Sequence, residues 1–106
     1  MTRATNNAGS SDSGAFPLTA EHADLAAAIM ARAYGDERVA ATPWSAAGIL
    51  GSLSARYGFG LGIGAPLHGF LLARQLGTDA ELLAIAIDQN ERRRGYGQIL
   101  LSAMMA

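Results

Sequence analysis

The sequence predicts a single α/β domain in which helices flank a central sheet. Half of the 106 residues are apolar, which suits one small hydrophobic core. Apolar residues recur at helical spacing in three segments, and short strand-like apolar runs lie between and before them. Along the chain the predicted order is strand, helix, helix, three strands, helix.

The N-terminal part of the chain combines a polar tail with the first strand and the first helix. Residues 1–14 are small and polar, so we expect a disordered tail without a signal peptide. Residues 16–18 form a candidate strand. Thr19 is a good N-cap residue, and apolar spacing predicts a helix over 20–33 that stops near Gly35.

The middle of the chain predicts a second helix and then a strand. Ser45 is the candidate cap of a helix that reaches Tyr57, with Gly58 as its stop. Apolar residues alternate with glycine over 59–63, which favours a crowded strand. Residues 60–65 also match the G-x-G-x-x-A pattern of dinucleotide-binding folds. That motif belongs between a strand and a helix, however, whereas this match follows a helix.

The last third of the chain predicts a hairpin followed by a helix. Residues 67–75 and 80–87 are apolar and of strand length, and residues 77–79, Gly-Thr-Asp, form a turn between them. Helical spacing returns after Asp88. This last helix has no stop signal before Ala106. We therefore expect residues 15–106 to be the N-terminal part of a larger domain.

Composition and charge argue against several classes of function. A net charge of −1 gives no basic face for nucleic acid, and the absence of cysteine excludes disulfide and thiolate chemistry. The two histidines form no metal-ligand pattern, and no apolar run is long enough to cross a membrane. We expect a cytoplasmic protein without a metal, nucleic-acid or membrane partner.

Three adjacent arginines, at 92–94, are followed by Gly95 and Gly97 in a chain with only eight cations. Like charges repel, so a compensating ligand is expected. A helix that starts after a glycine-rich loop presents unpaired N–H groups, which bind anions together with the helix dipole. The glycines let a phosphate approach the backbone, and Arg93 and Arg94 add groups suited to phosphate. The segment predicts a di- or triphosphate site, with a solvated loop as the alternative. It is no Walker loop, because the chain has no lysine.

Residues 81–101, ELLAIAIDQNERRRGYGQILL, resemble motif A of the GNAT acyltransferases. In that superfamily the acetyl-CoA loop has the pattern Q/R-x-x-G-x-G/A and follows an apolar strand. Within it, the chain is most similar to the RimI-type enzymes, which acetylate the N-terminal alanine of a ribosomal protein. That similarity also rests on TPWS at 42–45 and GFLLARQ at 69–75. The resemblance covers residues 16–106.

The resemblance implies a fold, a reaction and a cofactor site. The fold is a GNAT-like mixed central sheet with flanking helices, without the C-terminal strands and helix of the family. The reaction is direct acetyl transfer from acetyl-CoA to a protein N-terminal amine, possible acceptors including a ribosomal protein. Backbone groups of Ile85, Ala86 and Ile87 would pair with the pantetheine arm. The amides of the loop would hold the pyrophosphate; these belong to Arg93, Arg94, Gly95, Tyr96, Gly97 and Gln98.

The sequence assigns no catalytic residue. In the family a carboxylate takes the proton of the amine and a tyrosine protonates the thiolate, and in RimI-type enzymes both follow the motif A helix. Four side chains inside the chain are weaker candidates, each with a structural alternative: Glu81 (hairpin-edge carboxylate), Tyr96 (packing aromatic), His68 (core or edge histidine) and Trp44 (helix-entry anchor). A non-catalytic CoA- or nucleotide-binding module and an inactive fragment of such an enzyme remain alternative functions.

Overall fold

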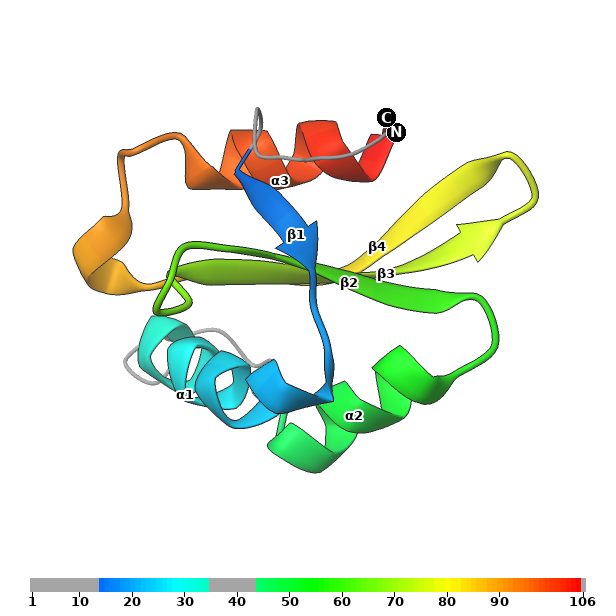
Figure 1. Cartoon of the computed structure of the whole chain (residues 1–106), viewed down its shortest axis with the longest axis horizontal. Coiled ribbons are helices and arrows are strands. Elements are labelled where there is room, and N and C mark those ends of the chain that lie inside the picture. The colour runs from blue at the N-terminus through cyan, green and yellow to red at the C-terminus, as the bar shows by residue number, and fades with distance from the viewer. Residues whose placement is uncertain (1–13, 35–43, 106) are drawn as a thin grey trace.

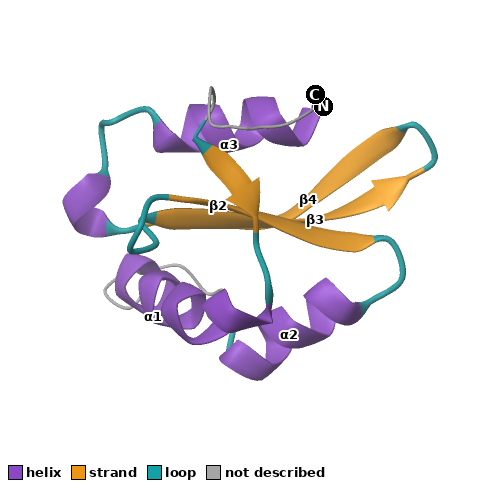
Figure 2. Cartoon of the chain, in the orientation of Figure 1, coloured by secondary structure: helices purple, strands orange, loops and turns teal. Residues whose placement is uncertain are grey.

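The structure is a computed structural model that describes residues 14–34 and 44–105. The chain folds into a four-stranded sheet. Figure 1 shows helices on both faces of the sheet, and Figure 2 shows the same arrangement by type of element. The predicted order of strands and helices is confirmed. Residues 1–13 of the tail predicted over 1–14 lie outside the described residues, as does the predicted stop at Gly35. The strands are β1 (Ala15–Pro17), β2 (Gly58–Ile63), β3 (Gly69–Leu76) and β4 (Asp79–Ile87), and the helices are η1 (Ala20–His22), α1 (Ala23–Tyr34), α2 (Ala46–Ser54), η2 (Gln89–Glu91) and α3 (Tyr96–Met105).

The four strands follow the order β1-β2-β3-β4, and each pairs antiparallel with its neighbour. The turn at Gly77, whose φ is +62°, joins β3 to β4 as predicted. The register shifts once along this hairpin, because Leu72 faces Ala84 whereas Ala73 faces Leu82. Leu83 is thus an extra residue in β4, and such a bulge bends the strand that carries it.

Strand β3 forms the centre of the core because both of its faces are buried. Phe70 and Leu72 pack against the face covered by α1 and α2, whereas Leu71 and Ala73 pack against the face covered by α3. All four are fully buried. This arrangement explains why the run is continuously apolar rather than alternating, since side chains point alternately to the two covered faces.

The glycines of β2 confirm the crowded strand and exclude the dinucleotide-binding motif. A Cβ on Gly60 would lie 2.9 Å from Leu53 Cδ2, and one on Gly62 would lie 2.9 Å from both Leu67 Cδ1 and Phe16 Cε1. Strand β2 then continues through a turn into β3, with no helix between them. The glycines therefore make room for neighbouring side chains within the fold.

The first helix begins differently from the prediction. Its first turn is the 3₁₀ helix η1, and the α-helix proper starts at Ala23. The sequence predicted that Thr19 caps an α-helix directly. In the structure the Thr19 N–H donates to Nδ1 of His22 at 3.0 Å, within the 3₁₀ turn. The histidine side chain folds back on this first turn, and 3₁₀ turns are frequent at the start of α-helices.

The second helix ends at Ser54, three residues before the predicted end at Tyr57. Ser45 caps its start as predicted and accepts from the Gly48 N–H at 3.1 Å. At the other end Tyr57 has a φ of +69°, which no α-helix can contain. Gly58 then passes so close under the helix that a Cβ there would lie 2.1 Å from the Ser52 carbonyl oxygen. The chain needs this glycine to turn into β2, so the helix stops early.

Candidate functional site

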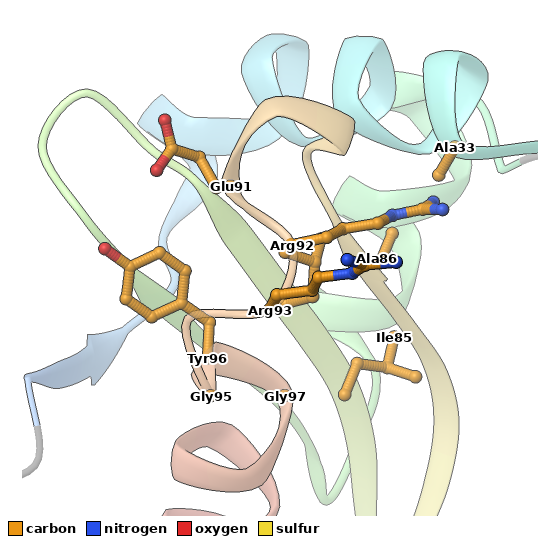
Figure 3. A pocket seen from close by; sticks show the side chains of 10 residues that line it. Ala33, Ile85, Ala86, Glu91, Arg92, Arg93, Gly95, Tyr96 and Gly97 are labelled. Carbon is orange, nitrogen blue, oxygen red and sulfur yellow. The ribbon is translucent and has the colours of Figure 1, made fainter.

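A cleft of about 460 Å³ lies between the end of β4 and the start of α3. Figure 3 shows the lining side chains, which come from β4, the loop, the start of α3 and the last turn of α1; those of Arg92 and Arg93 extend toward the side of Ala86 and Ile85, whereas those of Glu91 and Tyr96 point to the opposite side of the loop. The cleft is lined by Ala33, Ile85, Ala86, Ile87, Glu91, Arg92, Arg93, Gly95, Tyr96 and Gly97. The structure thus brings together most of the residues that the sequence assigned to cofactor binding, while Arg94 and Gln98 do not line this cleft.

The loop backbone presents free amides to the cleft. Helix α3 begins at Tyr96, and its first hydrogen bond runs from the Ile99 N–H to the Gly95 carbonyl oxygen at 3.0 Å. The N–H groups of residues 96–98 precede that bond, so they have no acceptor within the helix. With the dipole of α3 behind them, they form a site that favours an anion.

The two glycines of the loop have different roles. Gly95 has a φ of +78°, a conformation that favours glycine. Gly97 has no such constraint, and nothing lies within 4 Å of the position that a Cβ would take there. The fold itself therefore does not require a glycine at 97, and the open space there lies in the first turn of α3.

The three arginines separate into two groups. Arg92 and Arg93 line the cleft, and Figure 3 shows their side chains extending from the loop in the same direction. Arg93 has a φ of +71°, unusual for a residue with a side chain. Arg94 instead places its Nε 3.1 Å from Oε1 of Glu91. Glu91 and Arg92 were not among the predicted binding residues, although Arg92 is the first residue of the R-x-x-G-x-G pattern.

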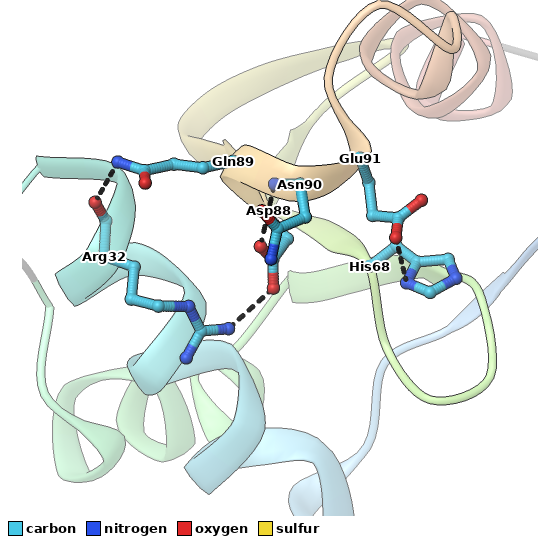
Figure 4. A network of polar contacts seen from close by, with 6 residues as sticks. All are labelled: Arg32, His68, Asp88, Gln89, Asn90 and Glu91. Atoms are coloured by element: carbon cyan, nitrogen blue, oxygen red, sulfur yellow. Dashed lines mark hydrogen bonds and ion pairs between the residues drawn. The ribbon is translucent and has the colours of Figure 1, made fainter.

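A second polar network ties the end of β4 to α1 (Figure 4). Nη2 of Arg32 lies 2.6 Å from Oδ2 of Asp88, and the Asn90 N–H donates to Oδ1 of Asp88 at 3.2 Å. Gln89 Nε2 donates to the Arg32 carbonyl oxygen at 2.7 Å. The hydrogen bond from Arg32, and then that from the Asn90 N–H, lower the pKa of the Asp88 carboxyl below its ordinary value. This capped turn is η2, which the sequence did not predict and which fixes the approach of the chain to the cleft.

The backbone of β4 contributes an edge to the cleft. The Asp88 N–H donates to the His68 carbonyl oxygen at 2.7 Å, so the backbone groups of Asp88 face β3. Because these groups alternate along an antiparallel ladder, those of Ile87 face the outer edge of β4. The strand is the last of the sheet among the described residues.

Of the four weaker catalytic candidates, Tyr96 lines the cleft, whereas Glu81, His68 and Trp44 do not. Glu81 pairs with Arg74 across the exposed end of the hairpin, outside the cleft lining. His68 is partly exposed; its ring stacks on that of Tyr96 with centroids 5.7 Å apart, and its Nδ1 lies 3.9 Å from Oε2 of Glu91. Trp44 packs on the α1–α2 core. Among the residues that the structure describes, no group of three or more His, Asp or Glu side chains is placed to hold a metal ion. No helix in the described ranges is long and apolar enough to cross a membrane.

The four-stranded antiparallel sheet flanked by helices, with a cleft between the end of β4 and the start of α3, forms a GNAT-like α/β fold. In its structure the chain is similar to the ribosomal-protein-S18-alanine N-acetyltransferase from Escherichia coli, with 27% sequence identity and a TM-score of 0.67. This match covers 84% of the chain but only 54% of that enzyme, so the chain spans about half of its length. The resemblance found in the sequence is thereby confirmed.

Two further solved structures have the same fold at lower identity. A tetramutant of the BH1408 protein from Bacillus halodurans matches with 12% identity and a TM-score of 0.63, over 86% of the chain and 72% of that protein. A second mutant of the same protein matches with the same identity and TM-score, over 86% and 71% of the two chains. No protein-family model matches the sequence, and no curated protein matches it significantly.

Proposed function

We propose that the cleft binds acetyl-CoA and that the chain is part of an N-acetyltransferase acting on a protein N-terminal amine. The observation that carries the proposal is the convergence on one cleft of a strand edge, the free amides of a helix start and two guanidinium groups. Acetyl-CoA has matching parts, namely an amide-bearing arm and a diphosphate. We further propose a cytoplasmic location, which suits a chain without cysteine.

The diphosphate lies at the N-terminus of α3 in this proposal. The amides of residues 96–98 donate to phosphate oxygens, and the open space at Gly97 lets a phosphate reach the backbone. Arg92 and Arg93 supply two positive charges from the loop. The repulsion between the two guanidinium groups costs stability in the free chain, and their attraction to the bound diphosphate offsets that cost.

The pantetheine arm lies along the outer edge of β4. Its amides pair with backbone groups of the strand, including those of Ile87, in the way that an extended peptide adds to a sheet edge. The side chains of Ile85 and Ile87 belong to the apolar lining next to that edge. The bulge at Leu83 bends β4 just before this segment.

The transfer step is direct. The neutral amine attacks the carbonyl carbon of the thioester, the carbon–sulfur bond breaks, and CoA leaves as a thiolate that takes up a proton. A base removes the proton of the attacking amine. The similarity to the Escherichia coli enzyme supports a protein N-terminal alanine as acceptor, although the chain spans only about half of that enzyme.

One observation favours a second candidate function, namely a module that binds CoA without transferring acetyl groups. Glu81, the carboxylate of β4 considered as a base, is paired with Arg74 outside the cleft lining. In such a module the anion site alone would be functional.

Calorimetric titration with acetyl-CoA, followed by an acetylation assay, tests both candidates. The acceptor is a peptide that begins with alanine, the product is detected by mass spectrometry, and an N-terminally blocked peptide is the control. Binding with transfer to the free peptide alone supports the acetyltransferase. Binding without transfer supports the module, and absence of binding contradicts both.

A further inference from the structure

Glu91 is a carboxylate in a cleft that we propose for a diphosphate. Of the residues that line the cleft in the structure, Glu91 alone is acidic. Its side chain is only 22% exposed. A negative charge at this place opposes a phosphate group, and the partly buried setting makes the repulsion stronger than in open water. The site therefore needs a means of offsetting this charge.

Both oxygens of Glu91 face cationic or ring nitrogen atoms. Nε of Arg94 lies 3.1 Å from Oε1, and Nδ1 of His68 lies 3.9 Å from Oε2. Figure 4 shows the His68 contact, and the ring of His68 is held in turn by its stack on Tyr96. Glu91 is thus fixed between the start of β3 and the loop, with the Arg94 guanidinium as its main counter-charge.

We infer that Arg94 is a positioning residue that neutralises Glu91 rather than a ligand of the phosphates. Arg92 and Arg93 line the cleft, whereas the Arg94 side chain, 62% exposed, lies against Glu91 outside the lining. The pair Glu91–Arg94 adds no net charge, so the two remaining guanidinium groups give the cleft its positive field. This inference rests on the proposed function and assigns Arg94 a role different from the phosphate contact that the sequence suggested.

A double-mutant cycle separates the two roles. If Arg94 acts through Glu91, Arg94→Gln weakens CoA binding because it leaves an uncompensated carboxylate in the cleft. Removing that carboxylate as well, in E91Q/R94Q, then restores binding. If Arg94 contacts the phosphates directly, the double variant stays as weak as Arg94→Gln, because the lost contact is not replaced.

Calorimetric titration of the 106-residue chain with CoA at low salt tests the inference. We expect Arg94→Gln to weaken binding about tenfold, equivalent to about 1.4 kcal/mol, and E91Q/R94Q to return to within about threefold of the original affinity. Arg94→Lys keeps a cation beside Glu91 and should lose less affinity than Arg94→Gln. A thermal melt of each variant checks that it is folded.

Two matched controls use other arginines. Arg92→Gln should weaken CoA binding. The double variant E91Q/R92Q should recover much less of the lost affinity than E91Q/R94Q does. Arg74→Gln, which breaks an exposed pair on the hairpin far from the cleft lining, should leave binding unchanged. No binding of CoA by the original chain would overturn the proposed function and this inference with it. Binding by the original chain without recovery in E91Q/R94Q would overturn this inference alone.

Discussion

Arg32 and Asp88 are joined by an ion pair of 2.6 Å, which ties the last turn of α1 to the residue that follows β4. Asp88 also accepts from the Asn90 N–H, so one carboxylate both caps η2 and holds α1. The cleft lies directly beyond this connection, with Ala33 on one side and the loop on the other. The pair therefore fixes two walls of the proposed cofactor site relative to each other.

The Arg32–Asp88 pair predicts a specific dependence of stability on pH. The pKa of Asp88 is lower in the folded chain than its ordinary value of 3.8, so the folded state favours the ionised carboxylate. Its contribution is present above that ordinary value and is lost as the pH falls through the lower pKa of the folded state. Asp88→Asn should cost about 1 kcal/mol at neutral pH, since Arg32 is half exposed. Urea unfolding at several pH values measures this, and a difference between the two chains that stays constant down to about pH 2 would contradict the assignment.

Gly97 predicts a variant that folds but does not bind. Because nothing lies within 4 Å of a Cβ at this position, Gly97→Leu should leave the thermal midpoint within a few degrees of the original. The side chain would occupy the place proposed for a phosphate and should weaken CoA binding at least about tenfold, or about 1.4 kcal/mol. Thermal melts and calorimetric titration measure the two effects. Unchanged affinity in the folded variant would place the phosphate elsewhere.

Arg92 and Arg93 predict binding that is sensitive to salt. Each substitution by glutamine should weaken CoA binding about tenfold at low ionic strength, and by less at about 1 M salt, where the Debye length is about 3 Å. Titrations at two salt concentrations measure this. Equal losses at both concentrations would indicate that the arginines support the loop structure instead of attracting the diphosphate.

The glycines around α2 predict opposite effects on stability. Gly58→Ala places a Cβ 2.1 Å from the Ser52 carbonyl oxygen, and the helix end must shift, at a cost of about 3 kcal/mol. Gly51, within α2, has nothing within 4 Å of its Cβ position, so Gly51→Ala should stabilise the fold by about 1 kcal/mol through helix propensity. Chemical unfolding compares the two variants. Similar destabilisation by both would mean that the helix end is packed differently.

Local patterns predicted most of the fold because each element has a clear local signal. The alternation in β2, the apolar runs of the hairpin and the Ser45 cap all have their expected structures. The end of α2 was missed because the contact of Gly58 with the Ser52 carbonyl comes from the return of the chain toward the sheet. The helical spacing of apolar residues up to Tyr57 is a local pattern, so it could not predict this tertiary contact.

The candidate cleft was partly predictable for the same reason. The R-x-x-G-x-G segment after an apolar strand indicated the anion site, because the physics of a helix start depends on neighbouring residues. The separation of Arg94 from Arg92 and Arg93 was not predictable. It depends on the position of Glu91 in η2, and η2 is set by the contacts of Asp88 with Arg32 and the Asn90 N–H.

Amide hydrogen exchange of residues 93–98 with and without CoA tests the central claim most directly. If the diphosphate binds at the start of α3, CoA at about 100 times its dissociation constant should slow exchange at these amides by up to about 100-fold. The same addition should leave the exposed turn at Gly77 and Thr78 unchanged. Protection of 93–98 beyond any general stabilisation would support the cleft as the cofactor site. Binding of CoA without protection of these amides would contradict it.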